Sequence, residues 1–257
     1  MRVSSKLRAG ASVLDGLYQS GCLKLLFPRA QADALTGVFL NTAGGLTGGD
    51  RISLDARAGA GSRLTLTSQA AERCYKATGE TVALMSTELT VEAEARLDWL
   101  PQETILFDQS ALRRRLCVQM APDARFLMVE PLVLGRLAMG EVMRSGLFQD
   151  SVRVSRGTDL VFADAVRLSG DIPAMLRGSA TADGAGAMAS VLYVGPDAEA
   201  HLAALRSLMP ATGGTSLLRP GVLYARLLAP DSFLLRRSLI PVIGQLHGRA
   251  LPKTWMM

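Results

Sequence analysis

Apolar residues at every second position recur along most of this 257-residue chain. Ile52 and Leu54 alternate with polar residues, and Leu64 and Leu66 repeat the pattern after the turn-forming run at 58–61. Because successive side chains of a strand point to opposite faces, this spacing predicts strands with one buried face. Such segments follow one another at short intervals, with turn residues between them. This favours an all-β sandwich, barrel or coil of stacked sheets.

Helical patterns are few and fall mainly in the last third of the sequence. Asp197 can cap a helix whose apolar residues recur at helical spacing as far as Pro210. Asp231 can cap a second helix, and Pro241 inside that segment should kink or shorten it. A third short helix is predicted near residues 137–144. We see no linker or low-complexity segment, so the sequence predicts one domain over residues 1–257.

Composition limits how such a chain can be stabilised. Hydrophobic residues make up 49% of the sequence but aromatic residues only 5%, so the core should be aliphatic. Cys22, Cys74 and Cys117 are widely separated and form no CxxC pair, which argues against a disulfide framework or a structural zinc site. No signal peptide is evident, and no apolar run approaches the roughly 20 residues of a membrane span. These features predict a cytoplasmic protein without membrane contact.

The charge balance is modestly basic. The net charge is +5, and the densest basic cluster is Arg113-Arg114-Arg115. This cluster has no interleaved aromatic residues on which bases could stack, so the pattern argues against nucleic acid as a partner. An acidic protein partner explains the same excess at least as well.

Two glycine pairs, Gly44-Gly45 and Gly48-Gly49, bracket Leu46 and Thr47. Glycine tolerates positive φ and close backbone approach, so the pairs predict a tightly shaped turn between strands. A phosphate-binding loop would need a lysine after its last glycine, whereas Asp50 stands there. A dinucleotide-binding glycine loop should open a helix, but the residues after Asp50 alternate as a strand.

The histidine, cysteine and carboxylate side chains offer few candidates for a catalytic site. His201 and His247 are the only histidines, and neither neighbours a serine or cysteine in an activating motif. Lys76 follows Cys74 closely and could lower the pKa of its thiol, although a partly buried structural thiol is the simpler interpretation. Glu103 and Asp108 could act as acid and base, or could be strand-end residues at a turn.

Glu130 interrupts the apolar run FLMVEPLVLG, where a charge is rarely buried unless it is paired. Arg136 lies just beyond that run and is the expected partner. Two interpretations remain open at this point. The pair is either a structural ion pair or part of the polar lining of an internal passage.

Several segments together resemble one family. They are NTAGGLTGGDR (41–51), LTSQAAERCYKATG (66–79), LDWLPQETILFD (97–108), EPLVLGR (130–136) and LPKTW (251–255). In this order and spacing they resemble the urease accessory protein UreD family, called UreH in some organisms. The resemblance implies a mainly β protein with many short strands stacked in a helicoid or β-solenoid-like layered arrangement, and two or three short α-helices.

The resemblance also implies a role without catalysis. Members form a complex with UreF, recruit the GTPase UreG and dock on the urease apoprotein, with two copies expected in a UreF-bridged assembly. The assembly supports GTP-dependent nickel insertion through an internal conduit. No permanently bound cofactor or metal is expected, only transient nickel.

Polar residues at the family motif positions are candidates for lining or supporting such a conduit: Asp50, Thr67, Ser68, Gln69, Glu103, Asp108, Glu130 and Arg136. Weak oxygen contacts let a hard, hydrated divalent cation move on, whereas a cage of cysteine and histidine would trap it. The alternative hypothesis is a small-molecule enzyme that uses the carboxylates near the glycine-rich turn.

Overall fold

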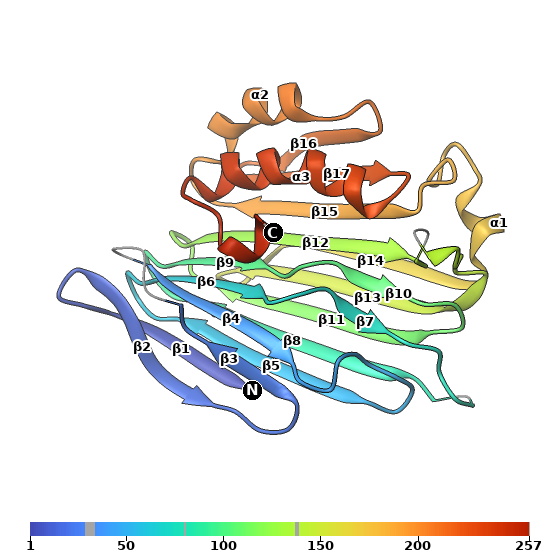
Figure 1. The fold of residues 1–257 in the computed structure, drawn as a ribbon. Coiled ribbons are helices and arrows are strands. Elements are labelled where there is room, and N and C mark those ends of the chain that lie inside the picture. Colours follow the sequence, from blue (N-terminus) through green and yellow to red (C-terminus); the bar gives the residue numbers. More distant parts are fainter. Residues whose placement is uncertain (29–33, 80, 137–138, 257) are drawn as a thin grey trace.

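The computed structural model describes residues 1–28, 34–79, 81–136 and 139–256. In it the alternating segments form two β-sheets that lie face to face (Figure 1). Within the described residues, sheet A has seven strands, in the spatial order β14 (Asp159–Asp171), β13 (Ser145–Arg156), β11 (Ala111–Met120), β8 (Ala83–Val91), β5 (Arg51–Ala58), β1 (Arg2–Arg8) and β2 (Ala11–Tyr18).

Sheet B has ten strands among the same residues. Its main order is β16 (Gly213–Arg219), β17 (Val222–Ala229), β15 (Ala187–Val194), β12 (Arg125–Leu134), β9 (Arg96–Leu100), β6 (Arg63–Ser68), β4 (Leu35–Asn41) and β3 (Leu23–Leu26). The short strand β10 (Thr104–Leu106) pairs with β12 on one side and with β7 (Glu72–Cys74) on the other.

The chain crosses repeatedly between the two sheets. It passes from β4 to β5, from β6 and β7 to β8, from β9 and β10 to β11, and from β12 to β13. The strands that these crossings link pair in parallel within each sheet, because every crossing returns the chain in the same direction. The pairs at the two ends of each sheet, such as β1 with β2 and β13 with β14, are antiparallel. The structure therefore confirms the mainly β, helicoid or β-solenoid-like arrangement of stacked strands.

Alternation decides which side chains enter the interior. In β5, Ile52 and Leu54 are buried between the sheets while Arg51 and Ser53 face outward. Strand β12 is buried on both faces, because its even-numbered residues enter the space between the sheets and its odd-numbered residues face the helices. This second apolar layer explains why the 126–134 segment reads as a nearly continuous apolar run.

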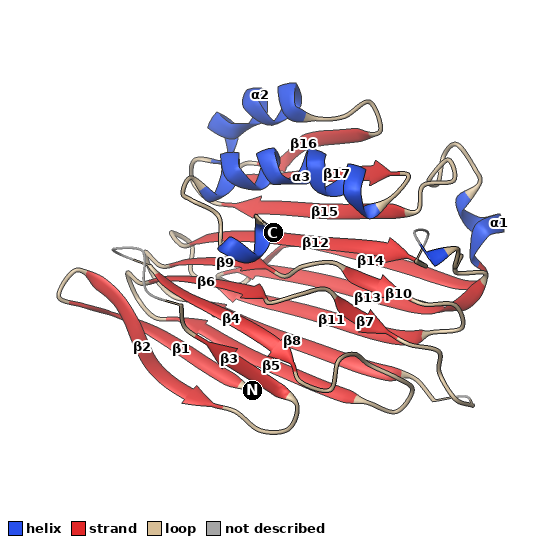
Figure 2. Cartoon of the chain, in the orientation of Figure 1, coloured by secondary structure: helices blue, strands red, loops and turns tan. Residues whose placement is uncertain are grey.

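Three α-helices occur in the described residues: α1 (Ile172–Leu176), α2 (Ala198–Leu208) and α3 (Ser232–His247). Helices α2 and α3 pack on the part of sheet B formed by β15, β16 and β17 (Figure 2). Asp197 and Asp231 stand at their N-caps as predicted, and the Asp231 carboxylate accepts a hydrogen bond from the Leu234 N–H.

Two helix predictions need correction. Residues 137 and 138 lie outside the described part of the chain. Met139 has a 3₁₀ conformation, and residues 140–144 form a turn and an isolated bridge where we expected a helix. Helix α3 runs through Pro241 to His247, so the proline does not shorten it. The apolar face around Leu239 and Val242 is fully buried, and this packing outweighs the hydrogen bond that proline cannot donate. Helix α1 was not predicted, although Asp171 and Pro173 signal its start.

The segment after α3 returns to sheet B and ends in the 3₁₀ turn η2 (Lys253–Trp255). The Trp255 side chain is fully buried, and its indole N–H donates to the Leu100 carbonyl at 3.0 Å. The Arg236 guanidinium lies 4.9 Å from the centre of the Trp255 ring and donates to the Thr254 carbonyl. These contacts fasten α3 and the C-terminal turn to the same strand end.

We expect Trp255→Ala to lower the free energy of unfolding by about 3–5 kcal/mol, because it removes a buried indole and leaves the Leu100 carbonyl without its donor. Urea denaturation followed by circular dichroism measures the change. Met256 is exposed, so Met256→Ala should stay within about 0.5 kcal/mol of the parent. Equal effects of the two substitutions would contradict an anchoring role for Trp255.

Candidate functional site

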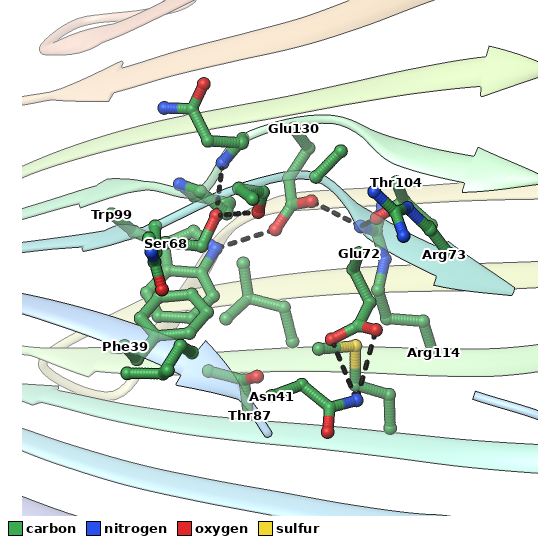
Figure 3. Close-up of a pocket in the computed structure, with 18 of the residues that line it drawn as sticks. Phe39, Asn41, Ser68, Glu72, Arg73, Thr87, Trp99, Thr104, Arg114 and Glu130 are labelled. Atoms are coloured by element: carbon green, nitrogen blue, oxygen red, sulfur yellow. Dashed lines mark hydrogen bonds and ion pairs between the residues drawn. The ribbon is translucent and has the colours of Figure 1, made fainter. Parts of the chain in front are cut away.

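A cavity of about 170 Å³ lies between the two sheets. Sheet B lines it with residues from β4, β6, β9 and β12, and sheet A closes it with residues from β8 and β11 (Figure 3). Apolar side chains such as Phe39 and Trp99, which stack with ring centres 5.3 Å apart, form part of the wall. Polar and charged side chains also line it, among them Ser68, Glu72, Arg114 and Glu130, which is unusual for the centre of a β-sandwich.

Glu130 is the most deeply placed acid of this lining. One carboxylate oxygen accepts a hydrogen bond from the Trp99 indole N–H at 2.7 Å, and the other pairs with an Arg114 guanidinium nitrogen at 2.5 Å. Figure 3 shows Glu130 held between these two side chains. The Trp99 indole and the Arg114 guanidinium therefore hold one carboxylate oxygen each and fix the position of the group.

Arg114 joins Glu130 to a second acid. Its guanidinium also binds both carboxylate oxygens of Asp150, at 3.0 and 2.6 Å, and donates to the Thr104 hydroxyl at 3.2 Å. The Arg114 side chain is only 8% exposed. One cation thus compensates two carboxylates inside the fold, and the cluster is rich in negative charge.

Burial changes the ionisation of this cluster. It raises the pKa of Glu130, an effect to which the nearby Asp150 carboxylate adds and which the Arg114 and Trp99 contacts oppose. Burial opposes the charge on Arg114 as well, but the two carboxylates outweigh it and raise the Arg114 pKa. The arginine therefore stays charged, while the acid beside it is easier to protonate than an ordinary glutamate.

A second acid, Glu72 of β7, faces the same cavity. The Asn41 side-chain amide donates to its two oxygens at 3.2 and 3.4 Å, and also to the Gly45 carbonyl at 3.1 Å. Burial raises the pKa of Glu72 in spite of these bonds. Asn41 and Glu72 therefore link the cavity wall to the start of the glycine turn.

Alternation explains why these charges point inward. In β11, Arg114 shares its face with Leu112 and Leu116, both of which are buried between the sheets. In β12, Glu130 shares its face with Met128 and Leu132. In the sequence, Arg114 stands with its exposed neighbours in a basic cluster. Its position among apolar residues at every second place in β11 is the signal that identifies it as inward-facing. Glu72, Trp99 and Asp150 are further site residues that the sequence did not single out.

Three of the predicted conduit residues, Ser68, Gln69 and Glu130, line this cavity. The Ser68 hydroxyl donates to the Ala70 carbonyl at 2.9 Å and accepts from the Gln102 N–H at 2.8 Å, so it shapes the cavity edge. The Thr67 hydroxyl instead bonds the Thr254 hydroxyl at 3.1 Å. The structure brings these side chains to one region but gives them different contacts.

Glu103 lies beside a neighbouring hollow of about 430 Å³, where Arg236 pairs with it at 3.1 Å. Gln69, Ala70 and Gln102 line both this hollow and the cavity. The side-chain nitrogen of Gln102 is buried and has no hydrogen-bond partner among the described residues. Polar surface therefore continues from the cavity to the second hollow.

Asp50, Asp108 and Arg136 are not among the described residues that line the cavity. Asp50 accepts from the Thr47 N–H at 2.8 Å inside the glycine turn. Asp108 accepts from two backbone N–H groups, those of Arg144 and Ser145, and these bonds outweigh slight burial to lower its pKa. Glu103 and Asp108 thus each have a separate structural partner.

One residue-level prediction, the partner of Glu130, is wrong. Arg136 pairs with Glu141 at 2.5 Å and not with Glu130, whose partner Arg114 comes from the opposite sheet. Burial raises the pKa of the Cys74 thiol to about 12, so Lys76 does not activate it. The simpler interpretation of Cys74, a buried structural thiol, is confirmed.

The glycine turn is the tight β connection that the sequence predicts. A Cβ atom on Gly45 would lie 2.4 Å from the Tyr75 ring, and one on Gly48 would lie 2.3 Å from the Thr81 hydroxyl. Gly44 and Gly49 adopt positive φ angles of 80° and 91°. The Leu46 N–H donates to the Arg73 carbonyl, which joins the turn to β7.

The two histidines lie in different places and have different partners. His247 is buried and its Nδ1 lies 2.8 Å from the Asp98 carboxylate, while His201 lies on α2 beside Tyr193. Across the described residues, no three side chains of histidine, cysteine, aspartate or glutamate converge on a possible metal position. No helix in that part of the chain has the length and apolar character to cross a membrane.

Comparison with known proteins gives the family. The sequence profile described as UreD urease accessory protein matches residues 1–256. The chain belongs to the UreD family. Proteins named urease accessory protein UreD from Roseobacter denitrificans and Ruegeria pomeroyi are 49% and 48% identical to it. These alignments cover 100% and 99% of this chain and 93% and 99% of the relatives.

Arg114→Met should destabilise this UreD-family chain by about 3–5 kcal/mol, because Glu130 and Asp150 would remain buried without their cation. The measurement is the urea unfolding free energy. Arg115→Met is the matched control, since the neighbouring Arg115 side chain is 59% exposed and pairs with Glu88 on the surface. Its loss should cost at most about 1 kcal/mol. A similar cost for both would contradict the buried cluster.

Glu72→Gln should remove a pH-dependent loss of stability. Because the folded state raises the Glu72 pKa, ionising this acid destabilises the fold. That loss is absent below the ordinary pKa of 4.5 and grows as the pH rises above it. The stability of the variant relative to the parent should therefore increase from pH 4.5 to pH 7, measured by urea unfolding at several pH values. A constant difference would contradict the raised pKa.

Proposed function

We propose that this UreD-family chain is a non-catalytic scaffold for urease maturation. Together with UreF and UreG it docks on the urease apoprotein and supports GTP-dependent insertion of nickel into the enzyme. The family membership and the names of the relatives support the role in urease maturation. The separate structural partners of Glu103 and Asp108 argue against the alternative of an acid–base enzyme.

The polar cavity between the sheets is the observation that supports a passage for nickel. A hollow of about 520 Å³ on the outer face of sheet A shares Met85, Arg114 and Arg115 with the cavity. On the other side, Gln69, Ala70 and Gln102 line both the cavity and the hollow beside Arg236. The three hollows follow one another across the sandwich, so we infer a transverse route.

The chemistry of the lining suits an ion that moves on. Glu72, Ser68, Gln69 and Glu130 offer oxygen atoms, which bind a hydrated divalent cation weakly compared with thiolate or imidazole. A cavity of about 170 Å³ has room for several water molecules around such an ion. Glu72 and Glu130 place two carboxylates on the lining, beside the guanidinium groups of Arg73, Arg114 and Arg115.

The assembly in this proposal contains two copies of the chain, bridged by UreF, in the cytoplasm. It involves neither nucleic acid nor a membrane, and nickel is transported cargo without a permanent cofactor site. The oxygen-rich lining of the route supports transfer over storage.

Gln69→Trp tests the route at the junction of two hollows. We expect a large side chain at this exposed position to obstruct passage without disturbing the core, so that urease activity and urease nickel content in cells fall about tenfold or more. Co-purification with UreF, UreG and urease should be retained.

Gln119→Trp is the matched control, because Gln119 is exposed on β11 and lines neither the cavity nor the adjoining hollows. Normal activation by Gln69→Trp would refute this route. Failure of the parent chain to co-purify with UreF and UreG would instead refute the scaffold proposal.

A further inference from the structure

Three arginines lie in one straight row across the outer face of sheet A. The strand register aligns Arg51 of β5 with Leu84 of β8, and Leu84 with Arg113 of β11. It continues from Arg113 to Gln149 of β13, and from Gln149 to Arg167 of β14. We call Arg51, Arg113 and Arg167, with Leu84 and Gln149 between them, the arginine row.

The arginines of this row are exposed and lack a carboxylate partner among the described residues. Neighbouring arginines on the same face behave differently, since Arg115 pairs with Glu88 and Arg57 pairs with Glu92. The row itself contains no acid. The arginines of the row therefore carry positive charge that no carboxylate of the row compensates, whereas Arg115 and Arg57 are compensated by glutamates.

In the described part of the chain, helices α2 and α3 leave the face that carries the row uncovered. Strands β5, β8, β11 and β13 are parallel, and parallel sheets are usually covered on both faces. Helices α2 and α3 lie on sheet B, and α1 contacts β13 and β14 at the edge of sheet A (Figure 2). The hollow of about 520 Å³ on this face is lined by Arg51, Leu84 and Arg113 of the row.

The spacing of the row indicates the shape of what binds it. Each arginine is separated from the next by one intervening strand, which puts their Cα atoms about 10 Å apart at the usual distance between strands. An α-helix rises about 10.5 Å over seven residues, or nearly two full turns. Carboxylates at every seventh position of a helix laid across the strands would thus meet successive arginines.

We propose that the arginine row is a docking site for an acidic amphipathic helix of a partner protein. Carboxylates seven residues apart pair with Arg51, Arg113 and Arg167, and apolar side chains of the same helix face contact Leu84. Guanidinium groups suit this role because each can bind a carboxylate through two parallel hydrogen bonds. The row lines the same hollow of about 520 Å³ that forms one end of the proposed metal route, so a docked helix would cover that end.

Nucleic acid fits the row less well. No aromatic side chain stands between the arginines, so bases have no surface on which to stack. The intervening positions are a leucine and a glutamine, which suit a helix with mixed apolar and polar residues. The binding assay includes a single-stranded oligonucleotide, so that nucleic-acid binding by this face would be detected.

The test uses the full chain and a labelled, helix-stabilised peptide built from alanine and glutamine, with three glutamates seven residues apart and leucines beside them. A control peptide has the same composition but glutamates five residues apart, which wind around the helix. Binding is measured by fluorescence anisotropy at an ionic strength of about 0.1 M. We expect the first peptide to bind at least about tenfold more tightly than the second.

Replacing Arg51, Arg113 and Arg167 by Ser should weaken binding about tenfold or more, since three surface ion pairs together contribute on that order. The matched control replaces Arg153, Arg206 and Arg237 by Ser, which removes the same charge from positions outside the row. Its binding should change by less than about twofold. Circular dichroism confirms that both variants are folded.

Four results would overturn the proposal: no binding of the first peptide, equal binding of the second, an equal loss in the control variant, or tighter row-dependent binding of a thymidine oligonucleotide. The last result would identify the face as a nucleic-acid surface. Because neither urease nor nickel is present in this assay, its outcome does not depend on the proposed role in urease maturation.

Discussion

Two sheets can share one apolar interior only when every strand keeps its inward-facing residues in line with those of its neighbours. In this chain the repeated crossing from sheet B to sheet A meets that condition, because each new strand adds parallel to the previous one. A shift of one residue in any strand would turn its apolar face outward. The stacked arrangement, the cavity and the arginine row all depend on this shared register.

The same register places two charged side chains at positions where apolar residues are expected. Arg114 and Glu130 occupy positions that apolar residues hold on either side along their strands. A buried ion pair seldom improves stability over a well-packed apolar pair, so its presence calls for a reason other than stability. Local departures from the folding pattern are expected at functional sites. The polar centre of an otherwise aliphatic sandwich is such a departure, and it is the place where we propose a route for an ion.

Sequence reasoning was successful where one residue's environment follows from its neighbours along the chain. Alternation predicted the strands around Ile52 and Leu64, and the glycine pairs predicted a tight turn. It was unsuccessful for the partner of Glu130, because Arg114 arrives from the opposite sheet and only the completed fold brings the two together. Helix α3 likewise continues through Pro241 because packing against sheet B, which the local sequence does not reveal, stabilises it.

The anchoring of Trp255 has a consequence for the order in which the molecule forms during synthesis. The crossings between sheets use neighbouring stretches of chain, so the ribosome releases them in a sequence that lets each strand add to an existing edge. The outer face of β9 and β12 is different, since Leu100 and Leu127 are buried by a layer that includes α3 and Trp255. Among the described elements this layer emerges last. A nascent chain therefore exposes a broad apolar face until its final segment is available, and this is the interval in which it is most vulnerable to aggregation.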